Sequence, residues 1–167
     1  MKSAVLLVEA NYEELELWVP YYRFLEAGLA AVLAGPQAGT VYAGKHGLPA
    51  RADVAFGDVQ LDKANVVLIL GGWAPDRLRT HASAVALVRS AVEREIVVAA
   101  ICHGGSVLVS ADVVRGRRVT SARSIRDDLR AAGAMWVDEP AVVDGRLVSS
   151  RAPADLPQFL GAILSLV

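Results

Sequence analysis

Short apolar runs alternate along the chain with longer stretches in which apolar residues recur at helical spacing. Four bounded apolar runs have the length of a strand: residues 4–8, 30–34, 66–70 and 97–101. Such runs favour parallel strands, because these are covered by helices on both faces. The stretches between them have the period of amphipathic helices, as at Val85, Val88 and Val92. We therefore predict an α/β fold, a three-layer sandwich with a mainly parallel, flavodoxin-like central sheet.

Other patterns predict the shorter elements. Gly44-Lys45-His46-Gly47 predicts the turn of a hairpin over residues 41–54, and residues 53–56 are expected to continue into a loop. Asp144-Gly145 suits the type I′ turn of a second hairpin. Pro20 interrupts the first helical pattern, so that helix is expected to start near it or to kink there. A last helix is expected from about Pro153 onwards.

The length of 167 residues favours a single domain spanning residues 1–167. No apolar run approaches the roughly 20 residues of a membrane helix, so we expect no membrane association. The 17 basic and 18 acidic residues nearly balance and form no basic tract, which argues against a nucleic-acid partner. Because the first residues lack the apolar core of a secretion signal, we expect a cytoplasmic protein. The mean hydropathy of +0.39 indicates buried strands or a subunit interface.

Cys102 is the single cysteine of the chain. One thiol excludes an internal disulfide framework and any multi-cysteine metal site, and no other metal site is expected. Composition alone favours a buried apolar side chain, since free cysteine is among the most buried residue types. The position of Cys102 favours a reactive thiol instead, because it directly follows a predicted strand and precedes Gly104 and Gly105. This is the pattern of a nucleophile elbow, where a helix N-terminus would stabilise a thiolate.

Three polar segments follow predicted buried strands: residues 11–16, 71–76 and 102–105. Open α/β sheets bind ligands beyond the carboxyl ends of their strands, so we expect these segments to meet. The backbone N–H groups of Gly72 and His103 could form an oxyanion hole. Glu13, Glu14 and Glu16 lie near the start of the first helix, where compensation of the helix dipole explains any one of them. A carboxyl group turned into the site would either donate a proton to the thiolate or repel it, and spacing does not choose which glutamate does this.

The remaining histidines, His46 and His81, are expected at the surface. His46 lies in the predicted glycine turn, and His81 precedes a predicted helix.

Together these segments resemble the ThiJ/PfpI superfamily over nearly the whole chain, and most closely its PfpI-type intracellular protease/amidase branch. The segments that carry the resemblance are Glu13-Glu14-Leu15-Glu16-Leu17 with Pro20-Tyr21, Gly44-Lys45-His46-Gly47, Gly71-Gly72-Trp73-Ala74-Pro75-Asp76, Ala100-Ile101-Cys102-His103-Gly104, Ile125-Arg126-Asp127-Asp128 and Val143-Asp144-Gly145 to Asp155.

The resemblance implies a class I glutamine-amidotransferase-like fold and a cysteine nucleophile, Cys102, on a strained elbow. It implies that Glu16 is the buried glutamate that hydrogen-bonds the cysteine and that His103 is the triad histidine. Asp76 matches an acidic position that reaches the histidine from a neighbouring subunit. Members of this branch form dimers that assemble into hexamers. The residues expected to line the pocket are Gly71, Trp73, Gly104, Ala122 and Arg123.

Three positions depart from the family pattern. Asp76 replaces the usual glutamate and is one methylene shorter. Gly105 replaces the usual proline after Cys-His-Gly. Ala122 stands where the family commonly carries tyrosine or histidine near the cysteine, and Arg123 after it is a candidate substitute.

The favoured hypothesis is a cofactor-independent cysteine enzyme acting on small carbonyls, by glyoxalase III-like or deglycase chemistry, or on amide and peptide bonds. Its expected partners are a small carbonyl or peptide substrate and further copies of itself. The alternative is a non-enzymatic, redox-sensing or chaperone-like stress protein that uses Cys102. A glutaminase-type amidotransferase is disfavoured, because such domains place their histidine far downstream and no histidine follows His103.

Overall fold

A computed structural model describes residues 2–167 and contains a central sheet of seven strands. Their order across the sheet is β10-β11-β7-β6-β1-β2-β5. The bounds are β1 Ser3–Leu7, β2 Ala30–Gly35, β5 Val54–Ala55, β6 Ala64–Ile69, β7 Val97–Ile101, β10 Ala141–Asp144 and β11 Leu147–Ser150. Neighbouring strands run parallel except for the antiparallel hairpin of β10 and β11. The predicted α/β fold with a mainly parallel sheet is therefore confirmed.

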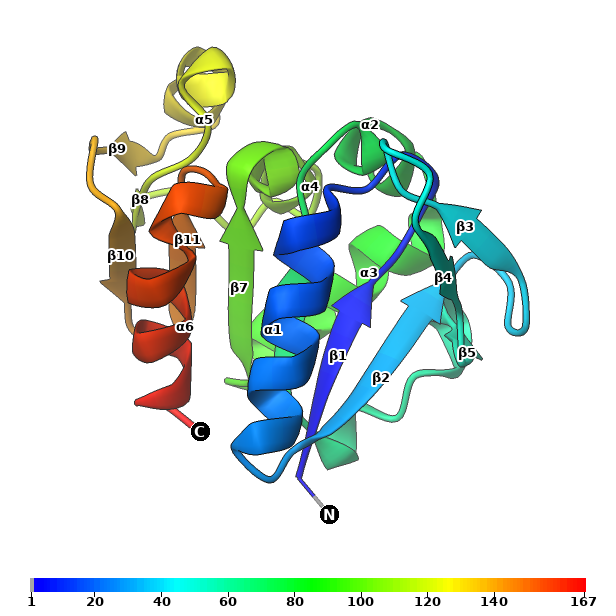
Figure 1. Ribbon diagram of the computed structural model, residues 1–167. Coiled ribbons are helices and arrows are strands. Elements are labelled where there is room, and N and C mark those ends of the chain that lie inside the picture. Colours follow the sequence, from blue (N-terminus) through cyan, green and yellow to red (C-terminus); the bar gives the residue numbers. More distant parts are fainter. Residues whose placement is uncertain (1) are drawn as a thin grey trace.

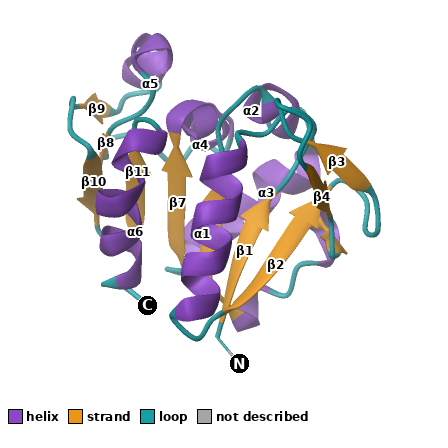
Figure 2. Ribbon diagram, viewed as in Figure 1, coloured by secondary structure: helices purple, strands orange, loops and turns teal. Residues whose placement is uncertain are grey.

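Helices cover both faces of the sheet (Figure 1). The longest are α1 Glu14–Glu26, α3 Ala82–Glu93 and α6 Leu156–Leu164. In Figure 2, α1 and α6 lie in front of the sheet and α3 lies behind it. The shorter helices are α2 Ala74–Leu78, α4 Gly105–Ser110 and α5 Arg126–Ala131. Because both faces are covered, all five residues of β1 and of β7 are buried, as the continuous apolar runs predicted.

Helix α1 runs without interruption through Pro20. Of the two alternatives at Pro20, a helix start is wrong, because the helix already begins at Glu14. Proline has no N–H, so the backbone carbonyl of Glu16, four residues earlier, loses its usual helical donor. Pro20 is buried, so its ring packs in the protein interior at the point where the helix lacks this hydrogen bond.

The two predicted hairpins are confirmed, but residues 53–56 do not form the expected loop. The type I′ turn expected for the second hairpin is also wrong, because Gly145 and Arg146 are its two central residues and only Gly145 has a positive φ. β3 Val41–Ala43 pairs with β4 Pro49–Arg51 around the glycine turn. Val54–Ala55 form edge strand β5 beside β2, and Phe56–Asp58 form a 3-10 turn. A two-residue strand is too short to show periodicity in the sequence. A separate parallel pair joins β8 Arg118–Val119 to β9 Met135–Trp136.

The carboxyl ends of the parallel strands lie together at one edge of the sheet, at the top of Figure 1. The loop after β1 packs there on the loop after β6, since Tyr12 and Gly72 form an isolated β-bridge. The backbone N–H of Trp73 also donates to the carbonyl of Asn11 at 2.9 Å. The polar segments at residues 11–16 and 71–76 thus meet as the topology predicted. Among residues 2–167, no helix is long and apolar enough to cross a membrane.

Candidate active site

Cys102 follows β7 directly and has a φ of 59°, in the left-handed region that few non-glycine residues adopt. A 3-10 turn over Cys102–Gly104 then leads into α4. A Cβ atom on Gly104 would lie 2.7 Å from the carbonyl oxygen of Ile69, so only glycine fits beneath this turn. The strand-to-helix corner has the strained backbone expected of a nucleophile elbow.

Polar groups face the Cys102 thiol from several segments of the chain. Its Sγ lies 3.2 Å from Nδ1 of His103. The backbone N–H groups of His103 and Gly72 also face the sulfur, and each lowers the pKa of the thiol. The two N–H donors proposed for an oxyanion hole therefore converge on the same atom.

Glu16 is fully buried behind Gly71. Its Oε2 accepts a hydrogen bond of 2.6 Å from the backbone N–H of Gly71. Its Oε1 has no hydrogen-bond partner among residues 2–167. Burial raises the pKa of Glu16 to about 7, although the hydrogen bond from Gly71 opposes this effect. Near neutral pH the carboxyl group can therefore both accept and donate a proton.

Burial also raises the pKa of the Cys102 thiol to about 12, and the negative charge of Glu16 adds to this effect. The backbone N–H groups of His103 and Gly72 act in the opposite direction. Because each charge opposes the other, Glu16 and Cys102 titrate as a pair. The thiolate expected at the helix N-terminus is therefore not the resting state: at neutral pH the thiol keeps its proton and would lose it during attack.

The three glutamates of the first helical turn have different partners. Glu13 pairs with Lys45 Nζ at 2.7 Å, and Glu14 pairs with His46 Nδ1 at 3.0 Å. The β3–β4 turn thus supplies the partners of Glu13 and Glu14. Only the Glu16 carboxyl group lies beside the thiol. Ligand atoms of Glu13, Glu14 and His46 lie within 4.8 Å of one another, but these ion pairs already account for the cluster.

His103 contacts a serine on the side of its ring away from the thiol. Its Nε2 lies 2.9 Å from Ser124 Oγ. The exposed ring of Trp73 lies 6.5 Å from the His103 ring, measured between centroids. Asp76, on α2, is exposed and makes no hydrogen bond or ion pair within residues 2–167. Its predicted contact with His103 of another subunit stays a prediction.

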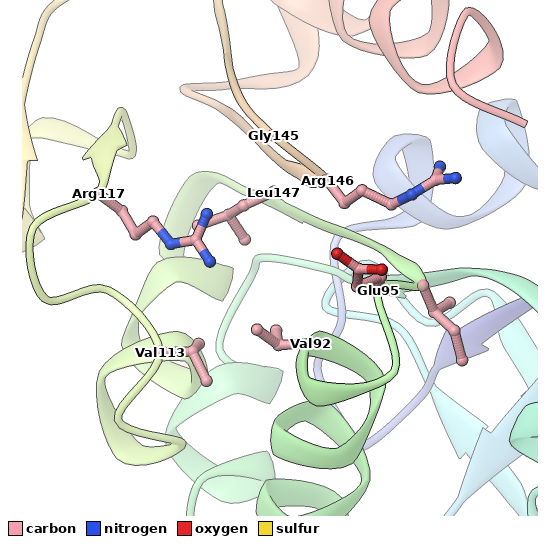
Figure 3. Close-up of a pocket in the computed structure, with 8 residues that line it drawn as sticks. Val92, Glu95, Val113, Arg117, Gly145, Arg146 and Leu147 are labelled. Carbon is pink, nitrogen blue, oxygen red and sulfur yellow. The ribbon is translucent and has the colours of Figure 1, made fainter.

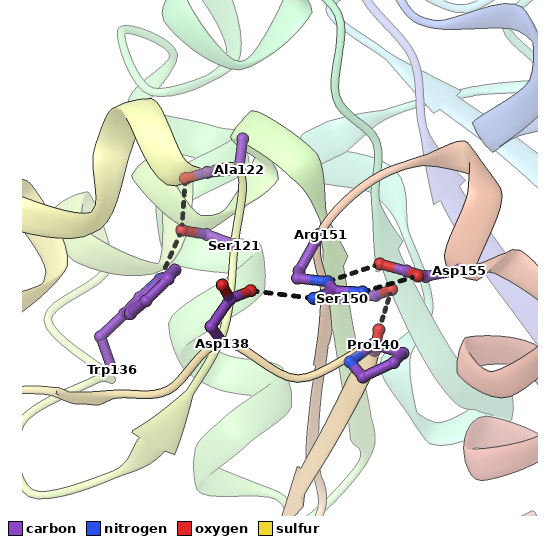
Figure 4. Close-up of polar contacts among 8 residues, drawn as sticks. All are labelled: Ser121, Ala122, Trp136, Asp138, Pro140, Ser150, Arg151 and Asp155. Atoms are coloured by element: carbon purple, nitrogen blue, oxygen red, sulfur yellow. Dashed lines mark hydrogen bonds and ion pairs between the residues drawn. The ribbon is translucent and has the colours of Figure 1, made fainter.

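Ala122 is joined to the elbow through its backbone. Its N–H donates to the carbonyl of Cys102 at 3.0 Å. Its carbonyl accepts from Ser121 Oγ at 2.8 Å, and Ser121 in turn accepts from Trp136 Nε1 at 3.0 Å (Figure 4). Arg123 follows as an exposed residue that makes no ion pair in the described part of the chain. No contact in the structure shows it replacing the missing aromatic side chain.

Two other features lie away from the residues that surround Cys102. His81 is half-buried rather than freely exposed, because its Nε2 contacts Glu9 Oε2 at 2.8 Å. Figure 3 shows a cavity of about 170 Å³. Its lining includes Ile96, which directly precedes β7, so the cavity lies at the opposite end of that strand from Cys102. Arg117 reaches into it but is paired with Asp144 at 3.2 Å.

Sequence reasoning missed Ser124 as a neighbour of His103. Ser124 lies 21 residues beyond His103, and no spacing rule relates the two. The Lys45–Glu13 ion pair was also missed, although Lys45 lies in a turn that the sequence singled out.

A model of the DJ-1/PfpI family matches residues 2–166. The chain is 41% identical over 164 residues to a protein of Pyrococcus horikoshii named as a deglycase, with 98% of each chain covered. It is 37% identical over 166 residues to the Bacillus subtilis protein named "Putative cysteine protease YraA", covering 99% of this chain and 98% of that protein. A crystal structure of an Anabaena variabilis protein with DJ-1/ThiJ/PfpI-like and ferritin-like domains has a TM-score of 0.96 and 38% identity, covering 99% of this chain and 48% of that chain.

Proposed function

The chain belongs to the DJ-1/PfpI family, and from this membership we propose that it is a cofactor-independent cysteine enzyme acting on small carbonyl compounds and glycation adducts. One observation carries the proposal. Cys102 has a left-handed backbone conformation at the corner between β7 and α4. Its thiol faces two backbone N–H groups and a buried carboxyl group. A nucleophile, an oxyanion site and a proton carrier are the parts that covalent carbonyl chemistry requires.

In the first step, Cys102 adds to the aldehyde carbon of a dicarbonyl while its proton passes to Nδ1 of His103. The C=O bond becomes a C–O bond, and the oxyanion is stabilised by the N–H groups of Gly72 and His103. The proton on this oxygen-bearing carbon then moves to the neighbouring carbonyl carbon, and the proton held by His103 passes to the oxygen of that neighbouring carbon. The first carbon regains its C=O bond, which leaves a thioester of a 2-hydroxy acid. Water cleaves the thioester, which releases the acid and restores the thiol, so that dicarbonyl and water give one hydroxy acid.

Glu16 is proposed as the carrier of the carbon-bound proton. A group that moves a proton in both directions works best when its pKa lies near the working pH. Burial raises the pKa of Glu16 to about 7, which meets this requirement. Its Oε1, buried and without a partner in residues 2–167, is free to receive the proton.

Peptide or amide hydrolysis is the second candidate. The Bacillus subtilis relative, named for a cysteine protease, favours it. The same nucleophile and oxyanion site would serve, with an amine as the leaving group. The name of the Pyrococcus horikoshii relative favours carbonyl repair, and we place carbonyl repair first because this relative is 41% identical to the chain and the Bacillus subtilis relative is 37% identical.

We further propose that the protein acts in the cytoplasm as a stress-response enzyme and assembles into dimers or hexamers. Four large apolar side chains on α1 are exposed and would suit a contact with a second copy: Leu15, Val19, Tyr22 and Leu25. Sedimentation analysis of the wild-type protein tests the assembly.

The function is tested by incubating the purified protein with methylglyoxal and measuring loss of the dicarbonyl and formation of lactate. Cys102→Ala should abolish both while leaving the circular dichroism spectrum unchanged. Turnover by Cys102→Ala at the wild-type rate would overturn the proposal. Turnover of a fluorogenic peptide alone would favour the second candidate. Selective oxygen addition at Cys102 by mild peroxide, without any turnover, would favour the redox-sensing alternative.

A further inference from the structure

We infer that Ser124 is the positioning residue of His103, and that the chain thereby supplies the histidine's partner from within itself. The inference rests on the proposed function, because it assigns Ser124 a part in setting the proton position on His103. It concerns a serine that no sequence motif singled out.

The imidazole of His103 is held at both of its nitrogens. Nδ1 lies 3.2 Å from Cys102 Sγ, and Nε2 lies 2.9 Å from Ser124 Oγ. A rotation of the ring would break both contacts at once. The contact with Ser124 therefore keeps Nδ1 directed at the thiol, as a base acting on Cys102 requires.

Ser124 is itself held in place by the elbow that it serves. It lies in the 3-10 turn Arg123–Ile125, which is closed by the N–H of Ile125 donating to the carbonyl of Ala122 at 3.2 Å. The N–H of Ala122 donates in turn to the carbonyl of Cys102 at 3.0 Å. The turn that carries Ser124 is thus bound to the nucleophile by a backbone hydrogen bond.

A second anchor holds the same turn from its other side. Ser121 Oγ donates to the carbonyl of Ala122 at 2.8 Å and accepts from Trp136 Nε1 at 3.0 Å (Figure 4). Ser121 is buried, so water does not compete strongly for these bonds. The two anchors fix the backbone next to Ser124. A fixed backbone can hold the Ser124 side chain in place against His103.

A hydroxyl group suits this position better than a carboxylate does. Its oxygen accepts a hydrogen bond from Nε2 when that nitrogen carries the proton, which leaves Nδ1 bare and able to take the proton of the thiol. Loss of the hydroxyl should therefore raise the share of the tautomer that is protonated at Nδ1. A carboxylate would favour the same tautomer, but it would add a second negative charge near a thiol that Glu16 already disfavours as an anion.

Positioning of His103 by Ser124 can be distinguished from positioning by Asp76. Asp76 is exposed on α2 and would need a second copy of the chain to reach a histidine. Ser124 needs no second copy. The two assignments therefore differ in which single substitution disturbs His103.

The test compares Ser124→Ala, Ser124→Thr and Asp76→Asn in the full-length protein. Ser83→Ala is the matched control, since Ser83 is an exposed serine on α3 whose hydroxyl makes no hydrogen bond within residues 2–167. The first readout is the ratio of the two His103 tautomers, measured by 15N NMR of protein labelled at histidine. Signals of His103 are assigned by their loss in His103→Gln.

Ser124→Ala should change the His103 tautomer ratio without moving the signals of His46 and His81, and Ser124→Thr should restore it. In the methylglyoxal assay, Ser124→Ala should lower kcat about fivefold to tenfold with little change in KM, the effect of losing one hydrogen bond to a reacting group. Asp76→Asn and Ser83→Ala should leave the tautomer ratio unchanged.

An unchanged tautomer ratio in Ser124→Ala would overturn the inference, as would a change produced by Asp76→Asn alone. The NMR readout does not depend on turnover. A wild-type protein that is inactive on methylglyoxal, but whose His103 responds to Ser124→Ala, would therefore contradict the proposed function and support the positioning role.

Discussion

The carboxyl group of Glu16 and the thiol of Cys102 face one another across Gly71. A Cβ atom on Gly71 would lie 2.5 Å from Glu16 Oε2 and 3.2 Å from Cys102 Sγ. The absence of a side chain at this position therefore lets the two groups approach. Because the two groups lie this close, the negative charge of Glu16 disfavours ionisation of the thiol, and this closeness requires glycine at position 71.

Gly71→Ala should disrupt the site more than the overall fold. The added methyl group would also lie 2.7 Å from Cys102 Cβ, so either the carboxyl group or the elbow must move. We expect a loss of about 1–3 kcal/mol in the free energy of unfolding, the usual cost of overpacking. Methylglyoxal turnover should fall about a hundredfold, because small displacements of reacting groups are that costly. Urea unfolding and initial rates measure the two effects.

Gly161→Ala is the control for this substitution. A Cβ atom on Gly161, inside α6, would have no neighbour within 4 Å. The free energy of unfolding should rise by about 0.5–1 kcal/mol, because alanine is the better helix former. Turnover should not change. Equal losses of activity in both variants would contradict the role of Gly71.

The stability of the protein should fall as the pH rises from 4.5 to 7. Below pH 4.5 Glu16 is protonated in both the folded and the unfolded chain. Between these values only the folded chain keeps the proton, so unfolding releases it and is favoured by rising pH. A pKa raised from 4.5 to about 7 corresponds to about 3 kcal/mol of lost stability. Urea unfolding at pH 5 and at pH 7.5 measures the difference.

Glu16→Gln should remove most of this dependence, because glutamine keeps the shape of the side chain but does not titrate. Its carbonyl oxygen can still accept the hydrogen bond from Gly71. The difference between pH 5 and pH 7.5 should therefore be much smaller in the variant. A pH dependence as steep as that of the wild type would assign the effect to another group.

Alkylation of Cys102 should be slow at pH 8 and should become faster in Glu16→Gln. Only the thiolate reacts, and burial and the Glu16 charge raise the pKa of the thiol to about 12. Removing the charge lowers this pKa and raises the thiolate fraction. Because Cys102 is the single cysteine, intact mass after timed addition of iodoacetamide gives the rate directly. Slower alkylation in Glu16→Gln would show that the carboxyl group favours the thiolate instead.

Ser121→Ala should destabilise the protein and loosen the turn next to the elbow. Ser121 is buried, and its loss leaves Trp136 Nε1 without the hydroxyl that accepts its hydrogen bond. The expected cost is about 1–3 kcal/mol in the free energy of unfolding. Ser165→Ala is the comparison, since Ser165 is exposed and its hydroxyl donates within residues 2–167 only to the backbone carbonyl of Ala162, in the same helical turn. A loss in Ser121→Ala no larger than in Ser165→Ala would contradict the anchoring role.

The sheet could be predicted from the sequence because its strands are buried on both faces. The apolar runs that end at Val8 and Ile101 have no polar positions to obscure them, and both correspond to observed strands. The elbow was visible for a related reason: Cys102 is followed by glycines, which such a sharp corner requires.

The choice among the three glutamates could not be predicted, because contacts distant in the sequence make it. Glu13 and Glu14 form ion pairs with Lys45 and His46, and only the carboxyl group of Glu16 lies beside the Cys102 thiol. Helical periodicity places all three near the start of one helix and contains no information about the hairpin. Only the folded arrangement of α1 against the β3–β4 turn decides which carboxyl group faces the thiol.

Ser124 escaped prediction for a different reason. Serine is common in turns, and its hydroxyl group becomes significant only through the 2.9 Å contact with His103. That contact depends on the hydrogen bond between Ala122 and Cys102, which joins two loops that no local pattern connects.

The assembly of the site from distant segments has a consequence for chains that have not finished folding. Glu16 and Gly71 are 55 residues apart, and Cys102 meets them only when β1, β6 and β7 have paired. Until then the thiol is solvated and ionises near its ordinary pKa of 9.0. Electrophiles should therefore capture nascent or partly folded copies more readily than mature ones, so completion of the sheet both creates the nucleophile and shields it from indiscriminate reaction.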